Sequence, residues 1–521
     1  AAAVALDPQR SVIRSYWGRM LYQVKEFDKA LAALERAREL DPNDPTPEFY
    51  RAIILRDLNR PQEAIQALNT AVELNDNRAV YRSRFLLDQD LAARNVDLSR
   101  LYTDVRLDTW ALNRGLAAIK QDYSSSQAHL LYAGALSRRE DQVFSFESEQ
   151  LLARLLMPAN VNSFNTYNNY TSLFEQPRTE GTAGVGVGTQ SYQSAEANVF
   201  GGAPRENLAY QAALQYGYTD GWRDTNNERV RSVAALAKWE PTARDGVFVS
   251  ASMSKVESRD YALQRFEIDS PIRPDDRQDG ELKRFELGYH RRLAPGSDFL
   301  VTLARLSLSP ESFTRMSTGF IGIPPAPGQP VLIDQDIPLV EDRDFDQAQA
   351  QFMRRVGDHQ FIAGTLQLWG EDDASVELEY SGETLVGGPD SRIPLCGQIP
   401  LPCGQLEDSG DLRVESYYLQ DIWSITPQLT LELAAYYDRV EDLSPFGQAP
   451  TTSGFDPRAG LIYTPNTRNT FRLAAFRAIQ PILSARTDPT EIAGIPVFRN
   501  DFSGSEHEVV AGAWEYGWDS G

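Results

Sequence analysis

One long hairpin pattern, over residues 413–439, limits what this chain can fold into more than any other stretch. Two alternating runs meet at the tight turn Thr426-Pro427-Gln428. The second run carries Leu429, Leu431, Leu433, Ala435 and Tyr437 on one face, and Thr430, Glu432, Ala434, Tyr436 and Asp438 on the other. A period of two belongs to a strand and not to a helix. Each run is roughly twice the usual strand length of about 5–6 residues and reaches the ~9–11 residues that cross a bilayer at a tilt.

The same period begins at Glu180 and continues to the end of the chain. Further alternating runs are Asn207–Tyr218, Arg229–Glu240, Gly246–Glu257, Glu281–Leu293, Asp298–Leu308, Asp346–Val356 and His359–Gly370. Short turns alternate with long connections, which we place at Arg259–Gly280, Ser309–Asp344, Glu371–Gly410 and Asp442–Gly454. Outer-membrane barrels have short periplasmic turns and long outer loops. The alternative, a soluble all-β sandwich or propeller, gives no reason for this regularity.

We therefore predict a large antiparallel transmembrane β-barrel over residues 181–521. We expect the barrel to be incomplete in this chain, because Asp519-Ser520-Gly521 resembles the start of a turn. Outer-membrane barrels usually end on a strand with a terminal aromatic residue.

The first part of the chain has a different pattern, a repeat of 34 residues. Leu6-Asp7-Pro8 returns as Leu40-Asp41-Pro42 and, degraded, as Leu74-Asn75-Asp76. Gly18, Leu21, Ala30, Leu34 and Ala37 correspond in the next unit to Ala52, Leu55, Ala64, Leu68 and Ala71. Small residues let two helices approach closely, and leucines fill the seam between them. This pattern resembles the tetratricopeptide repeat, and the alternative is an unrelated pair of helical hairpins.

The overall prediction is an α + β multidomain chain. We expect a tetratricopeptide-repeat α-solenoid over residues 1–157, with more repeats upstream, and a linker over 158–180. Within the solenoid the weaker elements are a helix at Ala79–Asn95, a repeat-like unit at Leu98–Lys120, and capping helices at Gln127–Arg138 and Phe146–Leu156.

Composition excludes some classes of function. The net charge of -22 and the pI near 4.7 argue against a nucleic-acid partner, which would select a basic face. No apolar run reaches the ~18 residues of a helical membrane span. Cys396 and Cys403 lie in one Gly/Pro-rich loop, where they form a disulfide in an oxidising compartment or remain two free thiols. A zinc half-site is less well supported, because the nearest histidine in sequence is His359.

The sequence offers no catalytic constellation. His129, His290, His359 and His507 are widely separated, and no nucleophile has a base at a suitable spacing. We therefore predict no enzyme activity, no cofactor and no metal site. The acidic runs 342–346 and 371–373 indicate solvated edges, with bridging cations as the alternative.

The region from Glu415 to Pro481 resembles the barrel of a TonB-dependent receptor. The residues that carry this resemblance are Tyr418–Trp423, Thr426–Leu431, Tyr437–Arg439, Phe455–Tyr463 and Phe471–Leu473, followed by Ser505–Gly512. The resemblance implies an outer-membrane barrel. Those receptors also carry a plug domain and a short box for an energising partner, which we do not find here, and repeats stand in the plug's place. No functional residue of the family is transferred, because the matching residues belong to the barrel wall.

Repeats followed by a barrel also resemble, in architecture, polysaccharide-export porins. We therefore expect an outer-membrane protein of a Gram-negative-type bacterium, with its repeat domain in the periplasm and outer-membrane lipid around the barrel. The leading hypothesis is a conduit or docking platform for the export or assembly of an envelope polymer or protein, which would also be the partner of the repeats. Receptor-like ligand uptake and a structural envelope scaffold are the alternatives. The predicted pore-lining residues are Gln211, Gln215, Arg305, Gln367, Glu432 and Asp438.

Overall fold

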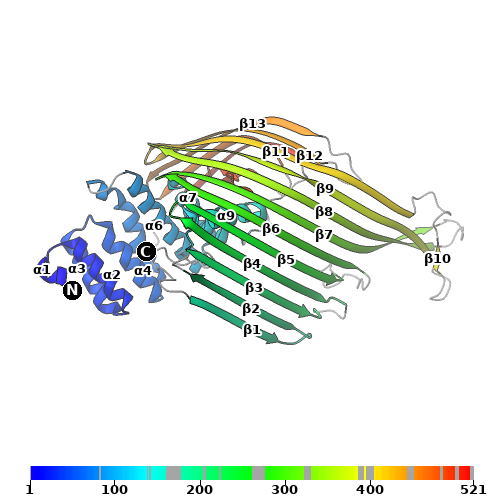
Figure 1. The fold of residues 1–521 in the computed structure, drawn as a ribbon, viewed down its shortest axis with the longest axis horizontal. Coiled ribbons are helices and arrows are strands. Elements are labelled where there is room, and N and C mark those ends of the chain that lie inside the picture. The colour runs from blue at the N-terminus through cyan, green and yellow to red at the C-terminus, as the bar shows by residue number, and fades with distance from the viewer. Residues whose placement is uncertain are drawn as a thin grey trace.

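The computed structural model describes most of the 521 residues. The described residues are 2–80, 84–137, 139, 142–159, 178–203, 207–221, 225–260, 276–321, 330–384, 392–394, 404–442, 451–466, 468–480, 485–498 and 504–516. An α-helical region comes first and a single large antiparallel sheet follows (Figure 1). The helices gather at the end of the sheet where the strands are joined by short turns.

The helical region confirms the predicted tetratricopeptide repeats. Its elements are α1 (Ala2–Leu6), α2 (Ser11–Gln23), α3 (Phe27–Leu40), α4 (Pro45–Asp57), α5 (Pro61–Glu73), η1 (Asn75–Val80), α6 (Arg84–Asp104), α7 (Asp108–Gln121), α8 (Ser126–Leu136) and α9 (Val143–Leu156). The first helices pair as expected because small residues face leucines. A Cβ atom at Gly18 would lie 2.8 Å from Leu34 Cγ, so this position needs glycine for the helices to approach.

The predicted boundary between residues 95 and 98 is wrong. Helix α6 runs without a break through this stretch, and Val96, Leu98 and Leu101 are all buried. No glycine or proline stands between Asn95 and Leu98 to end a helix there. The third repeat therefore has a first helix of 21 residues.

The sheet is built from strands that pair with their neighbours in chain order. They are β1 (Arg178–Val187), β2 (Gln193–Ala203), β3 (Leu208–Thr219), β4 (Glu228–Thr242), β5 (Asp245–Arg259), β6 (Arg277–Ala294), β7 (Ser297–Ile321), β8 (Pro330–Val356), β9 (His359–Thr384), β11 (Gly404–Thr426), β12 (Leu429–Asp442), β13 (Thr452–Asn466), β14 (Asn469–Ile479) and β17 (Glu506–Tyr516). The short strand β10 (Arg392–Pro394) pairs with β9, and β15 (Glu491–Ile492) pairs only with β16 (Ile495–Pro496). Over the described residues, β1 and β17 are the two edges of the sheet and do not pair with each other.

The hairpin at 413–439 is confirmed, whereas two of the predicted long connections are mostly strand. β7 continues to Ile321 and β8 begins at Pro330, while β9 runs to Thr384 and β11 begins at Gly404. Polar residues stand on the outer face of these extensions, as in the paired positions Asp342, Asp373 and Ser409, so the alternation in the sequence is weak. Backbone hydrogen bonds between neighbouring strands, and not side-chain alternation, therefore stabilise these strand extensions.

The two faces of the sheet differ in chemistry. The face away from the helices, here called the outer face, exposes leucines between two belts of aromatic side chains. One belt, near the short turns, contains Trp423, Tyr463, Phe471 and Trp514; the other contains Trp369, Tyr417, Tyr437 and Phe455. From Leu429, which pairs with Tyr463, strand β12 rises about 26 Å to Tyr437. At a tilt of about 40° this is about 20 Å along the membrane normal, close to the apolar band of a transmembrane barrel.

The described helices do not meet the requirements for a membrane span. None of them combines the length and the apolar composition that crossing a bilayer would need.

Candidate functional site: the occupied inner face of the sheet

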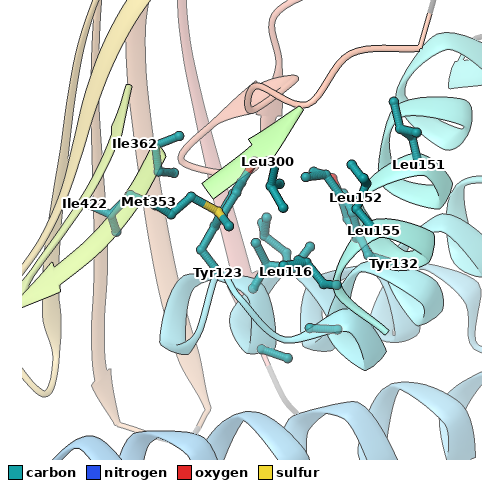
Figure 2. Close-up of a cluster of buried hydrophobic side chains, with 14 of the residues drawn as sticks. Leu116, Tyr123, Tyr132, Leu151, Leu152, Leu155, Leu300, Met353, Ile362 and Ile422 are labelled. Atoms are coloured by element: carbon teal, nitrogen blue, oxygen red, sulfur yellow. The ribbon is translucent and has the colours of Figure 1, made fainter. Parts of the chain in front are cut away.

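The last three described helices pack against the inner face of the sheet. Figure 2 shows Leu151, Leu152 and Leu155 of α9, with Leu116 of α7 and Tyr123, in one buried cluster with Leu300, Met353, Ile362 and Ile422 of the strands. The contact extends along β6, where Arg284 pairs with Glu147 at 2.7 Å. Since β6 ends at Ala294, this ion pair lies well away from the short turn, and α9 therefore reaches deep along the inner face.

A buried charge cluster joins helix α7 to the sheet. Lys120 Nζ lies 2.9 Å from Glu432 Oε2 on β12 and 2.5 Å from Glu491 Oε1 on β15. All three side chains are at most 6% exposed. The backbone N–H of Ala493 also donates to Glu432, at 3.2 Å. We call Lys120, Glu432 and Glu491 the inner lock.

The local sequence explains how Lys120 comes to be there. It stands in the last turn of α7, where a positive charge is favoured by the helix dipole. Burial lowers the pKa of Lys120, but the two carboxylates raise it by more, so the pKa lies above its ordinary value. The lysine is therefore charged, and the lock is an ionic contact in a dry environment.

The second occupant of the inner face is the segment 485–498, which lies between β14 and β17 and is called here the inner segment. Its short hairpin turns at Ala493 and Gly494, whose φ angles of 49° and 81° fit the type I′ turn of a tight hairpin. Gly460 on β13 lets the hairpin approach, because a Cβ atom there would lie 2.8 Å from Ala493 Cβ. The tip of the hairpin thus reaches the inner lock.

Arg486 anchors the other end of the inner segment. Its side chain is fully buried, with Nε 2.7 Å from Asp488 Oδ1 and one terminal nitrogen 3.0 Å from Ser416 Oγ on β11. Its backbone N–H donates to Ser148 Oγ of α9, at 2.9 Å. The inner segment therefore binds both the sheet and the helices.

A stack of rings and guanidinium groups holds the inner segment against β12 and β13. The guanidinium of Arg458 lies 3.5 Å from the ring centre of Tyr436 and 5.5 Å from that of Phe498, and Arg486 also lies 5.5 Å from Phe498. Cation–π contacts of this kind are stronger when they are shielded from water. The stack adds to the ionic anchors at both ends of the segment.

Four of the six predicted pore-lining residues lie on the inner face. Glu432 and Asp438 are buried there, and Gln211 and Gln215 share the face of buried Ala209 on β3. The face is not free, however, because Glu432 is bound by Lys120.

Arg305 and Gln367 lie on the outer face, which corrects the prediction for these two. Arg305 is 3.5 Å from Asp346, and both side chains are well exposed, at 63% and 40%. Gln367 alternates with inward Leu366 and Leu368, and its Nε2 donates to outward Thr365 at 3.1 Å. The inward neighbours Leu306, Leu366 and Leu368 belong to a buried apolar cluster of strand residues, so polarity does not distinguish the two faces at these positions.

Several functional residues were not found from the sequence. Lys120, Glu491 and Arg486 gave no local signal, since their partners are distant along the chain. Cys396 and Cys403, for which a disulfide and two free thiols were both left open, lie outside the described residues. Among those residues, no group of three or more His, Cys, Asp or Glu could hold a metal ion.

Comparison with known proteins gives two family matches. Residues 2–83 match the tetratricopeptide repeat model, and residues 221–505 match the model "TonB dependent receptor-like, beta-barrel". Cell division cycle protein 27 homolog A from Arabidopsis thaliana is 35% identical over 68 residues, which are 13% of this chain and 10% of that protein. The match is thus confined to a small part of either chain.

Similar solved structures include outer-membrane receptors and a tetratricopeptide-repeat protein. The siderophore receptor PiuA from Acinetobacter baumannii is 13% identical over 59% of this chain and 50% of its own, with a TM-score of 0.42. The ferric citrate transporter FecA is 12% identical over 58% and 44%, with a TM-score of 0.39. The tetratricopeptide-repeat protein YrrB is 16% identical over 31% and 77%, with a TM-score of 0.25. This chain therefore spans half or less of the receptors it resembles.

The second family model covers more than half of the 521 residues. The strand order, with each strand beside its neighbour in sequence, and the two aromatic belts agree with that match. The chain belongs to the TonB dependent receptor-like β-barrel family and carries tetratricopeptide repeats before its barrel.

Proposed function

We propose that this protein is an outer-membrane transport barrel whose passage is closed by its own chain and opens when that chain moves. The observation that carries the proposal is the occupied inner face, held by the inner lock and by Arg486. Buried charges are costly unless they are paired, so we expect this contact to be either fully formed or fully released. Such a contact suits a gate better than a permanent structural wall.

The position of the helices supports a periplasmic repeat domain. The helices lie at the short-turn end of the sheet (Figure 1), and in outer-membrane barrels short turns face the periplasm. Repeat solenoids present extended surfaces that bind proteins or polymers. A periplasmic partner that holds the repeats would be able to withdraw α7 to α9 from the inner face.

Receptor-like uptake of a ligand accounts for a closed barrel more directly than a permanently open conduit does. The export or assembly of an envelope polymer or protein is the second candidate, and the repeat domain supports it as a docking platform. In both cases the same gate must open, because α9 contacts strands β5 and β6 and its leucines share a buried cluster with further strands. A purely structural scaffold would not need a contact that can be released.

Conductance of single proteins in planar lipid bilayers tests the gate. The double variant Lys120→Met with Arg486→Met removes a cation at each end of the inner segment, and we expect large, long-lived openings where the wild type is closed. Arg305→Gln is the matched control, because it removes an arginine from the outer face and should leave the wild-type record unchanged. A wild type that conducts as freely as the double variant would disprove a self-closed barrel.

A further inference from the structure

The inner face carries a row of neutral amide side chains beneath its two occupants. The three successive inward residues in the middle of β8 are all glutamines, Gln347, Gln349 and Gln351. The next two strands of the sheet, β9 and β11, contribute Gln360 and Gln420. Each of these five side chains belongs to a residue that is at least nine-tenths buried. We call these five residues the glutamine track.

The chain's own backbone occupies most of the track. The Nε2 atoms of Gln347 and Gln349 both donate to the carbonyl of Ala485, at 2.8 Å, and the N–H of Thr487 donates to Gln349 Oε1, also at 2.8 Å. Gln360 donates to the carbonyl of Lys120 at 2.6 Å. The track thus binds groups that are neutral and that offer both donors and acceptors.

Further polar atoms of this face have no hydrogen-bond partner within the described part of the chain. The uncharged ones include Gln347 Oε1, Gln351 Nε2, Gln420 Nε2, Thr302 Oγ1 and Tyr436 Oη, and the charged ones include Glu432 Oε1 and atoms of Asp438 and Arg458. Buried polar atoms without partners are costly, and native structures contain few of them. Their grouping on adjacent strands indicates a surface built for a ligand rich in hydrogen-bonding groups.

Two tyrosines complete this surface. The rings of Tyr418 and Tyr436 stack at 5.4 Å with an angle of 18° between them. The side chain of Tyr418 crosses β9 at Gly364, where a Cβ atom would lie only 2.4 Å from Tyr418 Oη. The Tyr418 hydroxyl donates a hydrogen bond to Gln351 Oε1 at 2.7 Å. Flat aromatic faces therefore lie directly beside amides that can bind hydroxyl groups.

The side chains of the track are themselves uncharged, and the two cations that its occupants bring are both paired with carboxylates. Lys120 is held by Glu432 and Glu491, while Arg486 is held by Asp488. Once the occupants leave, the five glutamines and the two tyrosines offer neutral amides, hydroxyls and rings, and the charged groups beside them on β12 and β13 are Glu432, Asp438 and Arg458. A hydroxyl group both donates and accepts, so it can satisfy either end of an amide side chain.

We propose that the glutamine track binds a neutral polyhydroxylated chain, that is an oligosaccharide, in place of the inner segment. This inference rests on the proposed function, because the inner segment must move before the ligand can enter. The backbone of residues 485–487 then acts as a built-in substitute for the ligand when the barrel is closed.

Block of the channel by sugar tests the inference. In the Lys120→Met/Arg486→Met background, maltohexaose should interrupt the current reversibly, and a hexamer of galacturonic acid should do so far less. Replacing Gln347, Gln349 and Gln351 by methionine should weaken the block by about tenfold or more, because several hydrogen bonds are lost. Gln367→Met is the matched control, since this glutamine lies on the outer face and its loss should change nothing.

Calorimetric titration of the same proteins with maltohexaose separates this inference from the gate. Gln351→Glu provides a variant of nearly the same shape, in case the triple variant does not fold, and should also weaken binding. If the channel conducts but sugar binding does not depend on the glutamines, the sugar site is overturned and the proposed gate is unaffected. Glutamine-dependent binding without conductance would support the sugar site and overturn the gated passage. Tighter binding of the acidic hexamer would overturn the neutral ligand.

Discussion

Replacing Lys120 by methionine should release helices α7 to α9 from the sheet. Methionine keeps most of the length and apolar volume of the side chain but removes its charge. Glu432 and Glu491 would then be two buried carboxylates without a cation, at positions where the lysine now lies at 2.9 and 2.5 Å. Breaking a buried ion pair by removing one partner typically costs about 3–5 kcal/mol.

The structure places the expected cost at the lower end of that range. Each carboxylate keeps one backbone donor, since Ala493 N–H lies 3.2 Å from Glu432 and Gly494 N–H lies 2.5 Å from Glu491. We therefore expect a loss of about 3 kcal/mol in the free energy of docking, which corresponds to roughly a 100-fold larger undocked population. Further changes that neutralise both carboxylates, Glu432→Gln and Glu491→Gln, should recover at least part of this loss.

Amide hydrogen exchange in lipid nanodiscs measures the undocking. Backbone amides of α7 and α9 should exchange roughly 100-fold faster in Lys120→Met than in the wild type, while those of α2 and α3 should not change. Lys29→Met is a suitable control, because Lys29 is 67% exposed and its pair with Glu26, at 3.1 Å, should contribute about 1 kcal/mol or less. Exchange in α7 that stays within threefold of the wild type would refute the lock.

Three further substitutions test other parts of the structure. Gly364→Ala places a Cβ atom 2.5 Å from the carbonyl oxygen of Ala350, so we expect urea unfolding to show a loss of about 1–3 kcal/mol in the free energy of unfolding. Gly217→Ala is the control, because Gly217 has open space around it and this change should leave the free energy of unfolding the same. Burial raises the pKa of Asp97 to about 6. The folded state therefore loses stability as pH rises through about 4 to 6, and Asp97→Asn should stabilise the helical region by about 1–2 kcal/mol at pH 8 but not at pH 4. Arg305→Gln should change stability by about 1 kcal/mol or less and leave channel properties unaltered, which conductance would check.

The barrel wall was predictable because its signal is local. In β12 every second residue is apolar and faces outward, so Leu433 and Tyr437 are exposed while Glu432 and Asp438 are buried. The repeats were equally predictable, because a fixed period of 34 residues repeats the same helix seam. Both signals depend only on spacing within a short stretch of chain.

The content of the inner face could not be predicted in the same way. Lys120 and Glu432 are separated by 312 residues, and nothing near either position indicates the other. The occupied inner face also removes the usual contrast between a polar and an apolar side. Leu366 and Leu368 pack inward, so Gln367 between them faces outward, although polarity alone assigns it to the inner face.

The two occupants of the inner face enter from opposite ends of the sheet, which constrains how a gate could open. The inner segment follows β14 at the long-connection end, whereas α7 and α9 arrive from the short-turn end. They nevertheless bind each other, through Arg486 N–H to Ser148 and through Tyr123 Oη, 3.4 Å from the carbonyl of Thr487. Withdrawal of the helices alone would leave the inner segment without these partners and would expose Glu491. A ligand that displaced the inner segment would likewise strip Lys120 of one carboxylate. Each movement lowers the cost of the other, so the proposed gate opens by coupled release of both occupants and can be driven from either end.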